Sequence, residues 1–356
     1  MLSPAVRTML NQKRKTKRGK RDRLKKEQQF RKKRGTKQYP VHDNMEDTIK
    51  MFQEEVIKVN GIQSHQIQGY YYHKDGTKIG EGIAGSVYDC ALPKAEGGGA
   101  YAVKVMSYAI NELLHEKLEE FMHEFKVHSM LRDDERVVRA LGGFIEYTEG
   151  MVTCGIIMKR MDTTLAAYLA NKELTLKKAA MIALELLEVA VSTEKMQFMH
   201  HDLHMNNILC TDQGTCLCAC DYGQAASFGA RTEDVVKPYK YNEDVRAFDA
   251  DFPHYSWKHR TVNADESCDH FSIAYHILCV LHGYEHEVVQ YFKANAAAVL
   301  VGATARTRGI FAVMLPIRAL LKPCLEGGTK LDIQRMKEEL EKLVHNSTAE
   351  STFVKF

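Results

Sequence analysis

The stretch FMHHDLHMNNIL, which runs from Phe198 to Leu209, decides how this chain is interpreted. It places three histidines, one aspartate and two asparagines between apolar ends. Three interpretations are open at this point: a metal site, a loop for phosphate transfer, or a polar turn between two buried elements. The surrounding sequence has to decide between them.

A glycine-rich stretch, IGEGIAGSVYDC, precedes this region. Gly80, Gly82, Gly85 and Val87 have the spacing G-x-G-x-x-G-x-V. Dinucleotide-binding folds use similar glycines, but there the glycines open a helix. Here the flanking residues predict strands, and Lys104 follows in the strand AYAVKVM. Glycines let a backbone approach phosphates closely, and a nearby ammonium neutralises the phosphate charge.

A buried Lys104 needs an acidic partner, and the predicted helix NELLHEKLEEFMHEFKVHSML supplies several carboxylates. We prefer Glu124, because Phe121 and Phe125 indicate a buried neighbourhood around it. An exposed glutamate without this role is the plainer alternative at position 124. The other nearby carboxylates belong to Glu116, Glu119 and Glu120.

Five features thus occur in order: a glycine loop, a lysine, a helix glutamate, a loop with Asp202 and Asn207, and the triplet DYG that begins at Asp221. In this ordered set the sequence resembles the eukaryotic-type protein kinase superfamily, whose catalytic loop reads H-R-D-L-x-x-x-N. The resemblance covers about residues 68–345. It implies an α+β fold of two lobes, a small β-rich lobe with one long helix and a larger, mainly α-helical lobe. ATP and Mg²⁺ would bind between them.

The resemblance also implies a role for each matching residue. Lys104 would hold the α- and β-phosphates of ATP, and Glu124 would orient Lys104. Asp202 would accept the proton of the attacking hydroxyl, and Asn207 and Asp221 would bind Mg²⁺. The full set of predicted nucleotide-binding residues is Gly80, Gly82, Gly85, Val87, Ala102, Lys104, Met158, Met161 and Cys220.

The three histidines do not form a convincing zinc site. His200, His201 and His204 have no thiolate or histidine pair nearby that would complete a spaced ligand set. His200 matches the packed, structural histidine of the kinase family. The run CLCAC, residues 216–220, alternates as a strand does, so we expect a buried strand rather than a thiolate cluster.

Several positions depart from the kinase pattern. His201 replaces the arginine that usually receives an activation-loop phosphate, and a histidine cannot form that bidentate contact. His204 stands where Ser/Thr kinases usually carry a lysine that touches the γ-phosphate, and we assign it to the catalytic set. The loop around it is similar to divergent kinases of large DNA viruses and partly to haspin-type kinases. Tyr222 replaces the phenylalanine of D-F-G.

The segment after Asp221 is long and contains no A-P-E. Two aspartates compete for the role of the core-helix aspartate that braces the catalytic loop. We prefer Asp269, because the apolar helix FSIAYHILCVL follows it, over Asp244 in YNEDVRAF.

The domain organisation follows from composition. Residues 1–40 hold sixteen Lys and Arg against two acidic residues, so this basic arm should be disordered alone. Residues 41–67 contain an amphipathic helix with an apolar face at every third or fourth position. Residues 68–160 form the predicted small lobe and residues 161–350 the large lobe.

We therefore expect an ATP-dependent protein kinase that uses Mg²⁺ and phosphorylates Ser or Thr of protein substrates. A small-molecule phosphotransferase of the same fold is one alternative, favoured by His204 and the missing A-P-E. A weak pseudokinase that acts as a nucleic-acid or protein-binding module is another. Residues 12–37 could bind nucleic acid or an acidic partner. Scattered cysteines, no secretory signal and no long apolar run predict an intracellular protein. The basic arm and the viral likeness suggest a nuclear location or an association with nucleoprotein or virions.

Overall fold

The computed structural model describes residues 44–60, 77–82, 85–90, 101–111, 113–148, 150–170, 172–227, 267–283, 305–327, 329–346 and 353–355. The basic arm of residues 1–40 and Asp244 lie outside these residues.

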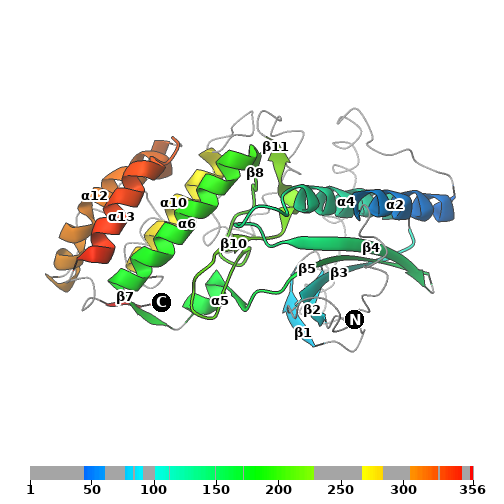
Figure 1. Ribbon diagram of the computed structural model, residues 1–356, viewed down its shortest axis with the longest axis horizontal. Helices are drawn as coiled ribbons and strands as arrows, with labels where there is room; N and C mark the ends of the chain where they lie inside the picture. The colour runs from blue at the N-terminus through cyan, green and yellow to red at the C-terminus, as the bar shows by residue number, and fades with distance from the viewer. Residues whose placement is uncertain are drawn as a thin grey trace, which may run out of the picture. The chain divides into compact units, whose positions relative to one another are not determined.

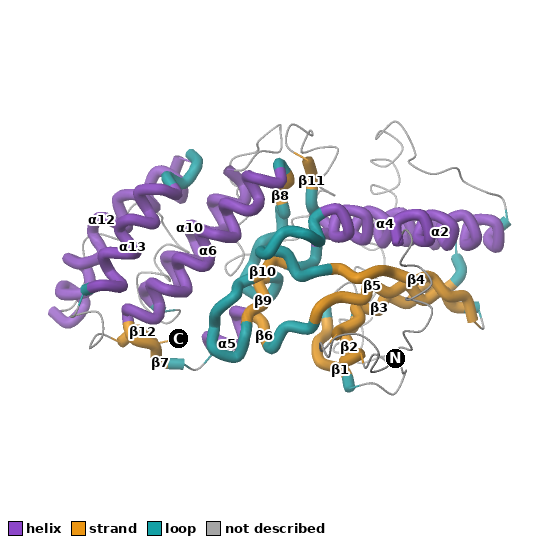
Figure 2. Tube along the Cα trace, viewed as in Figure 1, coloured by secondary structure: helices purple, strands orange, loops and turns teal. Residues whose placement is uncertain are grey.

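A single antiparallel sheet organises the first half of the described chain, with strand order β1-β2-β3-β5-β4 (Figures 1 and 2). The central strand β3 is buried on both faces through its middle, as expected for a strand with an apolar run. β4 forms one edge of the sheet. The five strands are β1 (Lys78–Glu81), β2 (Ser86–Cys90), β3 (Tyr101–Ala109), β4 (Ala140–Thr148) and β5 (Met151–Lys159).

Two helices accompany the sheet. The predicted long helix is present as α4 (Leu114–Met130), and the predicted amphipathic helix is present as α2 (Met45–Asn60). α2 buries Ile49, Phe52 and Val56, which lie on the apolar face seen in the sequence. It packs against α4 and β4 (Figure 1).

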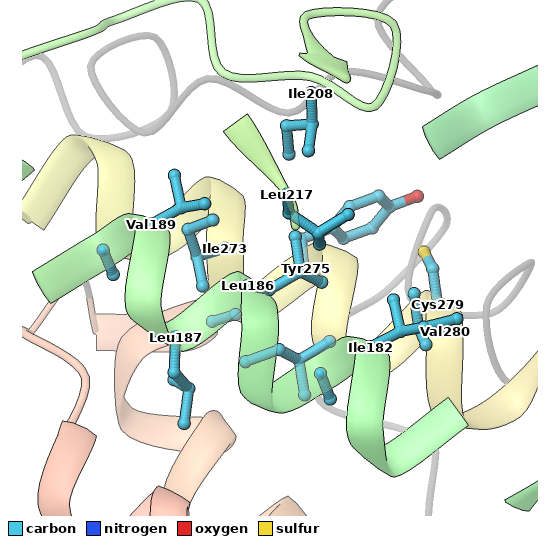
Figure 3. Packing of buried hydrophobic residues seen from close by; sticks show 14 of the residues in the cluster. Ile182, Leu186, Leu187, Val189, Ile208, Leu217, Ile273, Tyr275, Cys279 and Val280 are labelled. Carbon is cyan, nitrogen blue, oxygen red and sulfur yellow. The ribbon is translucent and has the colours of Figure 1, made fainter. Parts of the chain in front are cut away.

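Helices dominate the second half. Helix α6 (Leu176–Met196) packs against α10 (Ser267–His282) and α13 (Ile333–His345). α6 begins at the hydroxyl of Thr175, which accepts a hydrogen bond from the N–H of Lys178. In Figure 3, Val189 of α6 lies beside Ile273 of α10, and Ile182 of α6 lies beside Val280 of α10 in this core.

Helix α12, from Ala305 to Gly327, precedes α13 in the chain. Its first turns come from ARTRGIFAVML, which is rich in good helix formers. α12 contains Pro316 and Pro323 in its interior, for which we have no physical explanation.

Short elements connect the lobes and carry the loops. The predicted strand CLCAC is wrong in extent, because only Cys218–Ala219 form β10. A tight turn held by the N–H of Thr211 and the carbonyl of Thr215 precedes it, and exposed Cys216 has φ of 54°. The other short elements are β6 (Thr163–Thr164), α5 (Leu165–Leu169), β7 (Glu173–Thr175), β8 (Phe198–Met199), β9 (Ile208–Cys210), η2 (Tyr222–Gln224), β11 (Ala226–Ser227) and β12 (Phe353–Lys355).

The architecture is the α+β arrangement predicted from the sequence, a β-sheet region followed by a helical region. Within the described part of the chain, no helix combines the length and the apolar character that a membrane span requires.

Candidate active site

The glycine-rich motif forms the hairpin between β1 and β2. The N–H of Gly82 donates to the carbonyl of Gly85 at 2.8 Å, and Gly80 faces Val87 across the two strands. A Cβ at Gly85 would lie 2.3 Å from the carbonyl oxygen of Val105 on β3. Glycine is therefore required at position 85 because the hairpin approaches the backbone of β3 closely.

Lys104 projects from the middle of β3, where its strand neighbours are Val87 on β2 and Ile156 on β5. Its ammonium lies 2.6 Å from Oε1 of Glu124 and 3.0 Å from Oδ1 of Asp221. Burial alone would lower the pKa of Lys104, but the two carboxylates outweigh burial and raise it above its usual value. Lys104 is thus a buried, permanently charged ammonium.

Glu124 is the carboxylate of α4 that reaches Lys104, and its side chain is buried. Burial raises the pKa of Glu124, and the adjacent ammonium opposes this effect. Two of the alternative glutamates contact other residues of the same helix. Glu119 lies 3.3 Å from His115, and Glu120 lies 2.8 Å from Lys117. The structure therefore brings together the pair that the sequence favoured.

The catalytic loop is held from below by Asp269, the first-turn aspartate of α10. Its carboxylate accepts the N–H of His200 at 2.7 Å and the N–H of His201 at 3.0 Å. His201 has a φ of 66°, an unusual backbone conformation for a residue with a Cβ. The buried carboxylate of Asp269 thus stabilises a strained turn immediately before Asp202.

Asp202, His204 and Asn207 lie together in this loop. The Nδ2 group of Asn207 donates to the carbonyl of Asp202 at 2.9 Å and faces its Oδ2 at 3.4 Å. Nε2 of His204 lies 3.9 Å from the same Oδ2. The carboxylate of Asp202 therefore has an amide donor and an imidazole beside it.

His200 connects this loop to Asp221. Its Nε2 donates to the carbonyl of Cys220 at 2.8 Å, and its Nδ1 accepts the N–H of Asp202 at 3.3 Å. The N–H of Cys220 in turn donates to the carbonyl of Asn207 at 2.9 Å. One imidazole and one backbone bond thus tie Asp202 and Asn207 to the residue that precedes Asp221.

Tyr222 fills the core behind Asp221, which itself has a φ of 67°. The Tyr222 ring centroid lies 4.6 Å from that of His200 and 5.3 Å from that of His128 on α4. His128 Nε2 is hydrogen-bonded to the carbonyl of Val138, so Nε2 carries the proton. Burial lowers the pKa of His128 to about 4. A column of three buried rings therefore joins α4 to the catalytic loop.

The remaining predicted nucleotide-binding residues cluster near the end of β5. Ala102 on β3 and Met158 on β5 are cross-strand partners, and both are buried. Met161 follows the end of β5 and is half-buried, as is Cys220 before Asp221. These side chains are small or flexible and apolar, which suits contact with a planar base more than contact with a charged group.

The donor set suits Mg²⁺ better than zinc. The Nδ2 group of Asn207 is used by Asp202, so its amide oxygen is the atom that can bind a cation, as a carboxylate oxygen of Asp221 can. Oxygen donors are the ligands that Mg²⁺ prefers. Among the described residues, no group of three His, Cys, Asp or Glu side chains converges as a metal site. This geometry speaks against zinc at the three loop histidines.

Two contacts, one made by α4 and one made by α2, were not predicted. Nε2 of His123, the residue before Glu124, is hydrogen-bonded to the carbonyl of Ala225 at 2.9 Å. The side chain of Asn60, at the end of α2, binds the backbone of Gly143 on β4. His123 carries no sequence signal that separates it from an ordinary helix histidine. Asn60 comes directly after Val59 at the end of the apolar pattern of α2, and this position could have indicated a buried polar contact.

Comparison with known proteins agrees with the geometry. A family model described as the protein kinase domain matches residues 72–288, which is more than half of the 356-residue chain. A search of curated proteins found no match.

Proposed function

The chain belongs to the protein kinase family, and on that premise we propose that it is an active enzyme that transfers the γ-phosphate of ATP to serine or threonine hydroxyls of proteins. The observation that carries the proposal is the buried Lys104, which contacts Glu124 and Asp221 at once. A chain that had lost catalysis would have little reason to keep a buried ammonium with two carboxylates.

The side chains would divide the reaction as follows. Lys104 binds phosphate oxygens of ATP, and Glu124 keeps the ammonium in position. Asp202 accepts the proton of the acceptor hydroxyl. As the proton moves, the hydroxyl oxygen forms a bond to the γ-phosphorus, and the bond between this phosphorus and the β–γ bridging oxygen breaks. Asn207 and Asp221 would hold Mg²⁺, which neutralises phosphate charge when bound.

His204 belongs to the same proposal. Its imidazole Nε2 lies 3.9 Å from the carboxylate of Asp202, the proposed proton acceptor. We propose that His204 contacts the transferred phosphoryl group in place of the lysine usual in Ser/Thr kinases.

A transfer assay with radiolabelled γ-phosphate tests the proposal. The purified chain is incubated with Mg²⁺ and histones, casein or acidic peptides, and phosphoamino acids are then identified. Asp202→Asn is the matched control, and we expect its transfer to fall by about a hundredfold or more because the proton acceptor is lost. Absence of transfer by the wild-type chain to any protein or peptide would overturn the proposal.

A small-molecule phosphotransferase is the second candidate, because His204 and the missing A-P-E depart from kinases that dock peptides. Aminoglycosides in the same assay separate the two. Transfer to aminoglycosides without transfer to proteins would favour this alternative.

A further inference from the structure

Helix α2 lies against the two elements on which the Lys104–Glu124 pair depends. It packs on α4, which carries Glu124, and on β4, the edge strand of the sheet. Phe52 of α2 is fully buried and meets the ring of His115 in the first turn of α4 at 5.4 Å. Glu55 of α2 lies 3.4 Å from Lys126 of α4. α2 therefore contacts α4 on both sides of Glu124.

Polar side chains of α2 also occupy the open edge of the sheet. Nδ2 of Asn60 donates to the carbonyl of Gly143 at 2.9 Å, and Oδ1 of Asn60 accepts the N–H of Gly143 at 3.0 Å. Two residues further along β4, the carbonyl of Ile145 accepts Nε2 of Gln53 at 3.0 Å. An edge strand leaves alternate N–H and C=O groups without a strand partner, and α2 supplies partners for the N–H and C=O of Gly143 and the C=O of Ile145.

The position of Asn60 along the sheet is the informative feature. Gly143 on β4 faces Ile156 on β5, and Ile156 faces Lys104 on β3. Asn60 thus binds the sheet at the level of Lys104. A Cβ at Gly143 would lie 2.9 Å from the ring of Phe125, the residue after Glu124 on α4. Gly143 is therefore hydrogen-bonded to Asn60 of α2 and also lies against Phe125, in the turn of α4 that carries Glu124.

We propose that α2 is an internal brace that holds α4 in the position where Glu124 pairs with Lys104, and that Asn60 is its principal positioning residue. The inference rests on the proposed phosphate transfer, because its effect on turnover is exerted through Glu124. It assigns to residues 44–60 a role in setting catalytic activity beyond stabilising the fold. The Lys104–Glu124 pair then forms without an external activator.

Kinetics of full-length variants test the brace. Asn60→Ala removes both hydrogen bonds to Gly143. We expect kcat to fall about tenfold, because α4 then occupies the position in which Glu124 pairs with Lys104 for a smaller fraction of the time. Gln53→Ala, which removes one bond on the same helix, should lower kcat about threefold. Glu54→Ala changes an exposed residue of the same helix and should leave kcat unchanged. All variants should retain a cooperative thermal transition.

A double-mutant comparison separates positioning from simple loss of stability. In a Glu124→Gln background, Asn60→Ala should lower kcat by less than about twofold, because the pair on which Asn60 acts is already broken. Amide hydrogen exchange gives a readout independent of activity: residues 114–130 should exchange faster in Asn60→Ala than in Glu54→Ala.

The outcomes are distinguishable. If the wild-type chain transfers no phosphate, the proposed function fails, and the exchange measurement alone still tests whether α2 holds α4. If the wild type is active and Asn60→Ala has the same kcat as the wild type, the brace is excluded. The brace is also excluded if Asn60→Ala lowers kcat by the same factor in the wild-type and Glu124→Gln backgrounds.

Discussion

At the scale of single residues, buried polar groups of the site are hydrogen-bonded to one another. Asp269 accepts two backbone N–H groups, and His200 uses both ring nitrogens to join the catalytic loop to Cys220. Such networks are rigid, because removing one partner leaves another buried group unsatisfied. The hydroxyl of Tyr222 departs from this pattern, since no hydrogen-bond partner for it is found among the described residues.

Tyr222→Phe should therefore stabilise the protein. Tyr222 is 1% exposed, and removing an unsatisfied buried hydroxyl should raise the free energy of unfolding by about 1 kcal/mol. Phosphate transfer should be retained, because the ring still packs between His128 and His200. Denaturant unfolding monitored by circular dichroism measures the change.

Tyr168→Phe is the matched control, because the Tyr168 hydroxyl donates to the carbonyl of Gln213 at 3.1 Å. That substitution should lower stability by about 0.5–1.5 kcal/mol. Equal destabilisation in both variants would mean that the Tyr222 hydroxyl has a partner in the folded protein.

His128 predicts a loss of stability in acid. Burial lowers its pKa from 6.5 to about 4. Between these two pH values the imidazole is mostly protonated in the unfolded chain and mostly neutral in the folded chain. Stability from this group is fully present above pH 6.5 and is lost as the pH falls toward 4. The loss for this single imidazole should reach about 2 kcal/mol at pH 5.

His128→Gln isolates this effect, because glutamine keeps a donor for the carbonyl of Val138 and does not titrate. The difference in unfolding free energy between pH 7.5 and pH 5 should be smaller in His128→Gln than in the wild type by about 2 kcal/mol. His345→Gln, at an exposed histidine of α13, should leave the difference unchanged. An unchanged difference in His128→Gln would show that His128 is protonated in the folded state at pH 5.

At the scale of elements, α4 connects the parts of the site. It carries Glu124, packs His128 against Tyr222, and is hydrogen-bonded through His123 to Ala225, four residues after Asp221. The His123 bond joins α4 directly to the start of the segment that follows Asp221. A phosphate on that segment is therefore not needed to make this connection, and His201 could not bind one bidentately.

Activity should consequently be independent of phosphorylation in the segment after Asp221. Protein treated with phosphatase, then freed of it, should keep its rate within about twofold, because no arginine–phosphate contact is lost. Thr232→Ala/Thr261→Ala gives the genetic version of the test, at two threonines outside the described residues. Loss of activity that autophosphorylation restores would contradict the prediction.

Two features of these elements, the Lys104–Glu124 pair and the buried face of α2, could be predicted from the sequence. The buried charge of Lys104 demanded a partner, and the apolar surroundings of Glu124 sufficed to choose it. The period of Ile49, Phe52 and Val56 predicted a helix and its buried face. It could not identify β4 as the surface that this face covers, because that contact joins residues far apart in sequence.

Strand pairing was least predictable. β12 at the C-terminal end of the described chain pairs with β7, and Val354 is buried there, yet three residues carry no periodicity to detect. In CLCAC the alternation was real, but the turn at Thr211–Thr215 takes the chain to Cys216 before pairing begins. Short strands depend on their partners more than on their own residues.

At the scale of the whole molecule, charge is distributed very unevenly. Sixteen of the 49 Lys and Arg residues lie in residues 1–40, with two acidic residues, and the rest of the chain has 33 basic and 44 acidic residues. A basic arm on an acidic body suits a polyanionic partner that the body alone would repel. We propose that residues 12–37 bind nucleic acid and direct the protein to a nuclear or nucleoprotein compartment.

Deleting residues 1–40 should abolish retention of DNA or RNA at low salt and leave phosphate transfer within about twofold, because α2 and the site begin after residue 43. Binding by the full chain should weaken steeply with salt, since each phosphate neutralised by Lys or Arg releases condensed counterions. It should show little sequence preference, because Phe30 is the only aromatic residue in the segment 12–37 available to stack on bases. A salt titration of binding for the full and shortened chains measures both effects. Equal affinities would exclude the arm as the binding segment, and unfolding of the shortened chain would show that the arm is structural.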